Sequence, residues 1–224
     1  MSLNQIDLRI KYNHKHTNRF NPESWCIPEL YWRKLKDYDT KKVNKCTINV
    51  SDDWGEKVYY CTNWSDSKGM NVPFNFDEYF ASDNYKKKKM QLEAIHEGMV
   101  RIAEQEGWQI DQLLDAYNLC LADNLEYKFL VGKSKSSPNR KYKFNFWCNW
   151  DIDVFELYWV LQDKKGNELK KEKFIEREPY RGEFIYYIKF KWIDNETVLL
   201  EDNYKYGNKE KWEINLSDFI NELI

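Results

Sequence analysis

Metal chemistry in this chain would have to use few histidines, because the sequence contains only His14, His16 and His96. His14 and His16 are two residues apart and would point to the same side of a strand, where Cys26 or Asp7 could complete a set of ligands. This spacing is too loose for zinc, which needs three or four ligands at defined intervals. We therefore expect an Asn-rich surface loop here and no metal site.

His96 follows Glu93 by three residues, a spacing that di-metal carboxylate bundles use on their helices. Such a site needs a second Glu-x-x-His copy on another helix, and the sequence has none. We expect His96 to lie on a helix surface, at the edge of an apolar stripe.

Carboxylates are plentiful, so paired acids for glycoside hydrolysis are the catalytic arrangement to test first. Glu156 paired with Asp151 or Asp153 is the leading candidate. The separation of the two carboxyl groups distinguishes the possible mechanisms, and it is a property of the fold. Without recognisable machinery elsewhere, the sequence predicts no catalytic residue.

Nucleotide-binding motifs are incomplete. Gly132, Lys133 and Ser134 resemble the end of a phosphate-binding loop, but Tyr127 stands where that loop requires its first glycine. The period-two pattern that follows favours a hairpin loop, whereas a phosphate-binding loop leads into a helix. We therefore expect no nucleotide cofactor, and no other cofactor.

The charge balance gives no global field for nucleic acid or anionic lipid, since 35 basic residues face 37 acidic ones and the pI is near 6.0. The sharpest charge run is Lys86, Lys87, Lys88 and Lys89. Four cations in the first turn of a helix oppose the macrodipole, which can signal an anionic partner. A solvated lysine-rich face is the alternative, and we expect no nucleic-acid binding.

Length and cysteine content place the chain among ordinary globular proteins. Its 224 residues can bury a core without metal or disulfide support. The five cysteines are odd in number and form no C-x-x-C pair, which predicts reduced thiols. No apolar stretch is long enough to cross a membrane. We expect a cytoplasmic protein that does not associate with membranes.

Aromatic residues are unusually frequent: ten Trp, 16 Tyr and 12 Phe make up 17% of the chain. Such side chains either fill a core or provide a rigid contact surface. Their arrangement along the chain decides between these two uses.

Three regions differ in hydrophobic period. Residues 1–74 form a β-rich portion, with an early strand at residues 6–10, one short helix within residues 22–36, and a hairpin at residues 43–62. Residues 75–125 form a helical hairpin, whose first helix is capped by Ser82 or Asp83 and ends at Gly107. Residues 126–224 predict an antiparallel meander of six or seven strands, with a terminal helical turn at residues 218–223. The fold class is α+β, and we expect the helical hairpin to pack on this sheet.

Two strands of the meander each have an aromatic core face and a mainly polar outer face. Residues 141–150 and 184–193 both show this alternation. Three aromatic residues fall on the polar faces of these two strands and of the strand expected at residues 154–162, and cross-strand pairing could gather them into an exposed strip. These residues are Trp147, Tyr158 and Tyr187.

The strip predicts a non-catalytic binding protein of inhibitor, immunity or accessory type whose partner is another protein. An alternative is a binder or hydrolase of carbohydrate, or of another small polar ligand, that uses a Trp-lined cleft. Under the first hypothesis a protein contacts the aromatic strip, and under the second a carbohydrate or another small polar ligand binds in a cleft.

Overall fold

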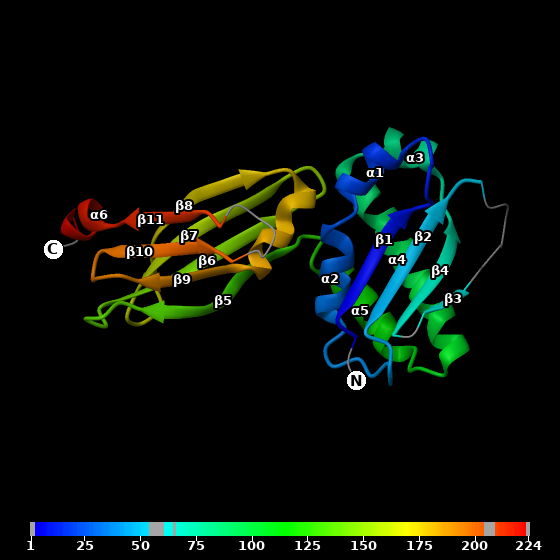
Figure 1. The fold of residues 1–224 in the computed structure, drawn as a ribbon, viewed down its shortest axis with the longest axis horizontal. Coiled ribbons are helices and arrows are strands. Elements are labelled where there is room, and N and C mark those ends of the chain that lie inside the picture. The colour runs from blue at the N-terminus through cyan, green and yellow to red at the C-terminus, as the bar shows by residue number, and fades with distance from the viewer. Residues whose placement is uncertain (1–2, 54–60, 65, 204–208, 223–224) are drawn as a thin grey trace. The chain divides into compact units, whose positions relative to one another are not determined.

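The computed structural model describes residues 3–53, 61–64, 66–203 and 209–222 (Figure 1). The chain divides into two compact units. The N-terminal unit contains Met1–Tyr127 and Asp151–Asp153, and the C-terminal unit contains Lys128–Trp150 and Val154–Ile224. Each unit has its own sheets and its own core.

The N-terminal unit contains a four-stranded sheet in the order β1-β2-β4-β3 (Figure 1). Its strands are β1 (Gln5–Ile10), β2 (Lys45–Ser51), β3 (Cys61–Trp64) and β4 (Ser67–Pro73). β1, β2 and β4 are parallel, and β3 is antiparallel to β4. The early strand is confirmed, but the predicted hairpin is wrong, because β2 pairs with β1 and β4. Residues 54–60 of that hairpin lie outside the described residues.

The described part of the N-terminal unit contains five helices. They are α1 (Thr17–Glu23), α2 (Cys26–Lys34), α3 (Phe76–Ala81), α4 (Asn84–Glu106) and α5 (Asp111–Ala122). α2 lies within residues 22–36, where the sequence predicts one short helix, and α1 precedes it as a helix that the sequence analysis missed. None of the described helices combines the length and the apolar character that a membrane crossing needs.

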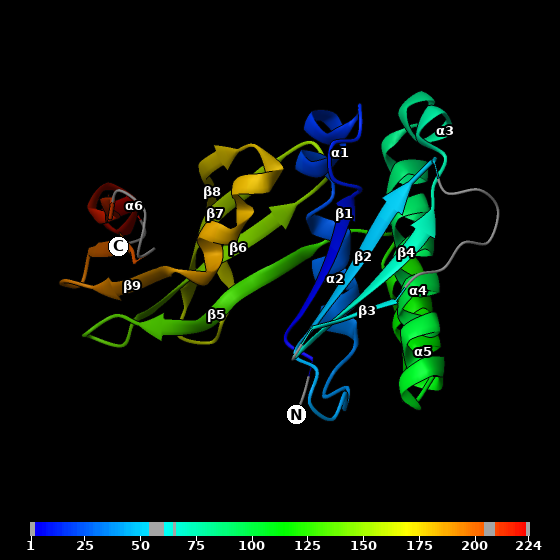
Figure 2. The ribbon, with the colours of Figure 1, turned by 45° about the vertical axis from the view of Figure 1, so that its right-hand side comes forward.

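The predicted helical hairpin is formed by α4 and α5. The Asp83 side chain caps α4 by accepting the N–H of Lys86 at 2.8 Å. Gly107 ends the helix with a φ of +67°, a left-handed conformation that favours glycine. α4 packs on the sheet at β2 and β4 (Figure 2). α5 packs on α2 and α4.

This packing corrects the expectation that the hairpin covers the C-terminal sheet. The apolar stripe of α4 covers the inner face of the N-terminal sheet, where alternate residues of the strands are buried. The contributing strand residues include Ile6, Leu8, Ile48, Val50, Met70 and Val72. Periodicity predicts that a helix has an apolar face, but it does not identify the sheet that this face contacts.

In the C-terminal unit the first four strands of the predicted meander form an antiparallel sheet in the order β5-β6-β7-β8. Its strands are β5 (Lys128–Ser136), β6 (Tyr142–Trp150), β7 (Phe155–Asp163) and β8 (Glu168–Arg177). Gly132 has a φ of +71° at the irregularity where β5 shifts its register against β6. The Gly-Lys-Ser sequence is therefore part of a β-bulge in a strand.

The remaining strands form a second, three-stranded antiparallel sheet in the order β11-β10-β9. They are β9 (Ile188–Trp192), β10 (Thr197–Asp202) and β11 (Lys211–Asn215), and helix α6 (Ser217–Glu222) follows them. The strand expected at residues 184–193 is correct only in its second half. Its first half belongs to the 3-10 helix η1 (Pro179–Tyr186).

The aromatic core face expected for β6 is buried at Phe144, Phe146, Cys148 and Trp150, whereas Tyr142 at its start is partly exposed. The three-stranded sheet covers this face. The Phe190 ring of β9 lies 5.8 Å from that of Phe144 and 5.3 Å from that of Phe146, between ring centroids. At the other side, the rings of Phe174 and Trp212 are 6.0 Å apart. The C-terminal core is therefore built between two sheets.

The close approach of α4 to β2 makes Gly98 a sensitive position. A Cβ atom at Gly98 would lie 2.6 Å from Cδ1 and 2.9 Å from Cγ2 of Ile48. We expect Gly98→Ala to lower the free energy of unfolding by about 1–3 kcal/mol through overpacking. This would occur even though Ala is favoured over Gly by about 1 kcal/mol in a helix interior. Urea unfolding followed by circular dichroism measures the change.

The control is Ile48→Val, which removes the nearest methyl group. The double variant should be less destabilised than the sum of the two single variants, because the smaller side chain makes room for the added Cβ. Additive losses would contradict a direct clash between these two residues.

Candidate functional site

Trp147 and Tyr158 lie directly opposite each other on the outer face of the four-stranded sheet. They are register partners between β6 and β7, and both side chains are partly exposed. Leu130 of β5 is the partner of Trp147 on its other side and is 44% exposed. The structure therefore brings two of the predicted strip residues together and adds an apolar neighbour that sequence reasoning missed.

A lysine of β8 lies over both aromatic rings. The Lys171 ammonium is 4.6 Å from the centroid of the Trp147 ring and 5.1 Å from that of Tyr158. A cation in this position is attracted by the negative face of an aromatic ring. The sequence did not predict this contact, because Lys171 follows Trp147 by 24 residues and only the pairing of β6, β7 and β8 brings them together.

Glu156 of β7 organises the polar part of the same face. Its carboxylate accepts hydrogen bonds from Asn149 Nδ2 at 2.8 Å and from the Tyr158 hydroxyl at 3.1 Å. Lys173 Nζ lies 2.6 Å from Glu156 and 2.6 Å from Glu176. Glu156 therefore fixes the positions of an aromatic hydroxyl and of an ammonium group.

These contacts shift the pKa values of the groups involved. The hydrogen bond from Lys173, followed by that from Asn149, holds the pKa of Glu156 below its ordinary value. Burial, followed by the hydrogen bond to Glu156, raises the pKa of Tyr158. At neutral pH Glu156 is ionised and the Tyr158 hydroxyl is protonated, as their hydrogen bond requires.

Tyr187 lies outside this outer face. It follows η1 and precedes β9 of the three-stranded sheet, so it is not on a strand of the four-stranded sheet. Two further tyrosines of the same segment, Tyr180 and Tyr186, are 38% and 45% exposed, and Tyr187 is 39% exposed. Sequence reasoning placed Tyr187 on a strand because residues 184–193 alternate. By the same alternation it assigned Tyr186 to the core face, which is wrong, and it did not consider Tyr180.

The acidic residues considered for catalysis are held by separate groups of partners. Asp151 lies 3.1 Å from Lys88 Nζ, and Asp153 accepts a hydrogen bond from Asn84 at 2.9 Å. Both belong to the N-terminal unit, whereas Glu156 belongs to the C-terminal unit. The contacts of these three acids therefore give no support to a catalytic pair.

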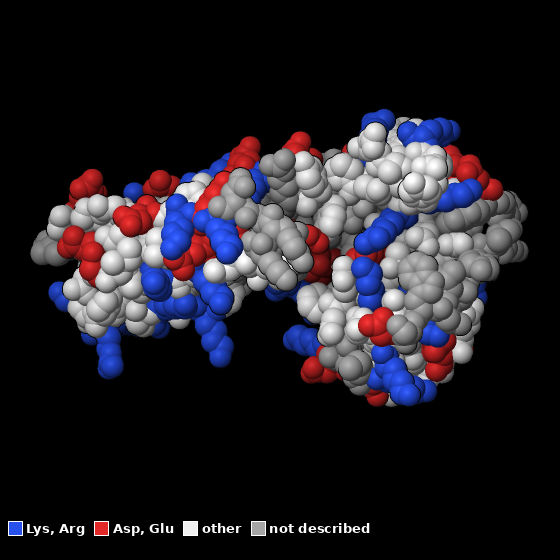
Figure 3. Space-filling view, viewed as in Figure 1, with Lys and Arg blue, Asp and Glu red and all other residues white. Residues whose placement is uncertain are grey.

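The lysine run at the start of α4 is neutralised within the fold. Each of its four ammonium groups lies within 4.0 Å of a carboxylate. The acidic partners, in order along the run, are Glu78, Glu23, Asp151 and Glu93. Acidic and basic side chains are also interspersed over the face shown in Figure 3. The run therefore needs no anionic partner to balance it.

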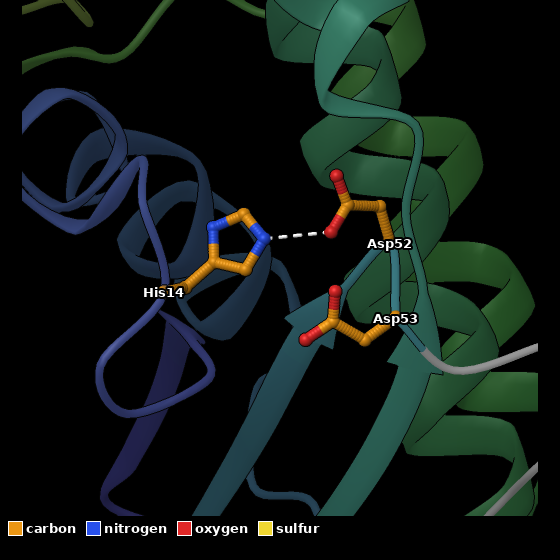
Figure 4. A group of neighbouring side chains, drawn as sticks. All are labelled: His14, Asp52 and Asp53. Atoms are coloured by element: carbon orange, nitrogen blue, oxygen red, sulfur yellow. Dashed lines mark hydrogen bonds and ion pairs between the residues drawn. The ribbon is translucent and has the colours of Figure 1, made fainter.

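A second group of side chains lies where the parallel strands of the N-terminal unit end. His14 follows β1, and Asp52 and Asp53 follow β2 (Figure 4). One ligand atom from each of these residues lies within 4.8 Å of the others. The sequence pointed to Cys26 or Asp7 as companions of His14, but the parallel pairing of β1 and β2 brings Asp52 and Asp53 instead.

The hydrogen bonds of His14 determine what this group can do. Its Nδ1 accepts the backbone N–H of His16 at 3.2 Å, and its Nε2 lies 2.6 Å from Asp52 Oδ1. In the neutral ring the proton is therefore on Nε2, which donates to Asp52. The His14 side chain is only 3% exposed and contacts the Phe76 ring.

A divalent cation bound at Nε2 would displace that proton and leave an N–H at Nδ1, facing the N–H of His16. Both nitrogens are already engaged, so neither is a free metal ligand or general base. Burial raises the pKa of Asp52, but the hydrogen bond from His14 and the charge of Lys15 outweigh this and lower it overall. The arrangement therefore favours a structural role, in which the His14–Asp52 contact holds two loops together, and not the role of a metal centre.

His96 is more buried than expected. Its Nδ1 lies 3.1 Å from the Tyr31 hydroxyl, and its ring centroid is 4.7 Å from that of Tyr117. Tyr31 donates its own proton to the carbonyl of Leu113 at 3.2 Å, so it accepts from His96. Burial lowers the pKa of His96. This histidine packs α2, α4 and α5 together in neutral form.

Comparisons with models of protein families, with curated proteins and with solved structures find no match to this chain. The geometry of its side chains is therefore the basis for any functional assignment.

The contact between His14 and Asp52 should stabilise the fold. In a double-mutant cycle with His14→Ala and Asp52→Ala, we expect a coupling free energy of about 1–3 kcal/mol, as for a hydrogen bond to a charged group. The control cycle uses Lys11→Ala and Asp53→Ala, a more exposed pair 3.1 Å apart, which should couple by less than about 1 kcal/mol. Urea unfolding measures both, and equal couplings would contradict a special role for His14.

Glu156 should make stability depend on pH in the acid range. Its folded pKa lies below the ordinary value of 4.5, so its stabilising contribution is complete above pH 4.5 and is lost as the pH falls through the folded pKa. The difference in stability between the wild type and Glu156→Gln should therefore be present at pH 7 and shrink on acidification. Thermal unfolding at several pH values tests this, and a constant difference would contradict it.

Proposed function

We propose that this protein is a non-catalytic binding protein that recognises another protein through the outer face of its four-stranded sheet. The observation that carries the proposal is the pairing of Trp147 with Tyr158, beneath one shared ammonium group from Lys171. Partly exposed aromatic and apolar side chains on a regular sheet are typical of contact surfaces between proteins.

The face is organised before any partner arrives. Glu156 holds Tyr158 and Lys173 through hydrogen bonds, and the aromatic rings hold Lys171. Side chains that are already ordered lose less conformational entropy on binding. This preorganisation supports a role in recognition.

The same contacts argue against the alternative function, carbohydrate binding. A sugar that stacks on Trp147 needs an open ring face, and the Lys171 ammonium lies 4.6 Å from the ring centroid. The polar groups beside it, Asn149 and Glu156, already bind each other at 2.8 Å. A stacked sugar would have to displace one or more of these contacts.

The test removes the apolar part of the face without removing core side chains. Leu130→Asp places a charge beside Trp147, at a position that is 44% exposed, so the melting temperature should change little. Capture of a specific partner from the lysate of the source cells should be lost, as it should be for Trp147→Ala. Affinity capture with mass spectrometry, together with thermal unfolding, measures both properties.

The matched control is Tyr12→Ala, which removes an aromatic side chain that is 87% exposed in the N-terminal unit. This variant should keep the partner that the wild type captures. If Leu130→Asp captures the same partner as the wild type, the proposed surface is wrong. A thermal shift with oligosaccharides that disappears in Trp147→Ala would support the carbohydrate alternative instead.

A further inference from the structure

The cations on the outer face of the four-stranded sheet differ in whether they are neutralised. Lys173 is held between Glu156 and Glu176. For Lys171 and Lys143, by contrast, no carboxylate of the described residues lies within 4.0 Å. Two unneutralised ammonium groups therefore accompany the aromatic pair.

These two lysines lie on neighbouring parts of one surface. Lys143 is paired with Gln162, while Lys171 is paired with Val160 two residues earlier on the same strand. Because adjacent strands are about 4.8 Å apart, β6 and β8 are separated by about 10 Å. A short extended segment of a partner could contact both ammonium groups at once.

The surface between the lysines is closed. Asn145 and Val160 form one cross-strand row with Lys171, next to the row of Lys143 and Gln162, and they are 1% and 3% exposed. The accessible surface at this place is therefore formed by the longer side chains around them, including those of Trp147 and Lys171. A partner would therefore contact aromatic rings and ammonium groups on the surface, and it would not insert a side chain into a deep pocket.

We infer that this face binds an acidic segment of the partner protein, in which carboxylates contact Lys171 and Lys143 while an apolar side chain contacts Trp147 and Leu130. This inference rests on the proposed function and specifies its partner. The rings restrain the Lys171 ammonium but leave N–H donors for a carboxylate. Complementary charge then contributes specificity and a faster association rate.

A peptide fits this face better than a nucleic acid does. A phosphate backbone carries one negative charge per nucleotide, and the ionised Glu156 and Glu176 on the same face would repel part of it. A peptide can place single carboxylates at the two free ammonium groups and neutral side chains elsewhere. Because acidic and basic groups share this face, it favours a partner whose acidic residues are separated by neutral ones.

The test is selection from a random dodecapeptide display library on the immobilised protein of 224 residues, with counter-selection on the Leu130→Asp variant. Peptides enriched on the wild type should contain Asp and Glu above their library frequency, next to apolar residues. On Lys171→Glu the acidic enrichment should disappear and Lys or Arg should be enriched instead. An enriched acidic peptide should bind Lys171→Gln about tenfold more weakly than the wild type, and more weakly at high salt.

The matched control is Lys165→Glu, which makes the same change in net charge at an exposed turn residue between β7 and β8. It should keep the acidic enrichment. Enriched peptides without acidic bias would overturn the inference while leaving the protein-binding surface intact. A library with no enrichment over Leu130→Asp would count against the proposed function itself. If the protein binds an oligothymidylate and Lys171→Glu abolishes this binding, the partner is a nucleic acid and the inference of an acidic peptide is wrong.

Discussion

The register between β6 and β7 is the constraint on which the outer face of the four-stranded sheet depends. It sets Trp147 opposite Tyr158 and Phe146 opposite Trp159. Because side chains alternate between the faces of a sheet, a shift of one residue would turn the outer aromatic pair inward. The contact of Phe146 with Phe190 in the core opposes such a shift. The outer surface is therefore positioned by the packing of the inner one.

Most charged and polar groups that stand out in the sequence are satisfied within the fold. The lysine run of α4 contacts four different acids, and His14 uses both ring nitrogens in hydrogen bonds. Such groups have already formed their favourable contacts, so they offer little to a ligand. Lys171 is different, because among the described residues its ammonium contacts aromatic rings and no carboxylate.

The three types of aromatic side chain differ in how far they are buried. Of the tryptophans whose side chains are described, Trp108, Trp150 and Trp159 are buried and the others are partly exposed. The largely exposed aromatic side chains of the described residues are tyrosines, among them Tyr12 and Tyr186. This distribution follows from chemistry, since a phenol has a hydroxyl that remains solvated while its ring contacts protein. In the proposed contact surface, the Trp147 ring is therefore partly packed against its neighbours and partly exposed.

The sequence by itself determined several of the strands and helices. The alternation at β1 and β6, the cap at Asp83 and the stop at Gly107 all depend on neighbours within a few residues, and the structure has each of them. The contacts between distant segments were decided only by the tertiary structure. It placed α4 on β2 and β4, divided the predicted meander into two sheets, and put Tyr187 beyond a 3-10 helix. The physical reason is that each apolar face of a helix or sheet must be covered, but any other apolar face of suitable shape can cover it, so the local pattern does not specify the partner. Only the packed chain brings Lys171 to Trp147 and Asp52 to His14.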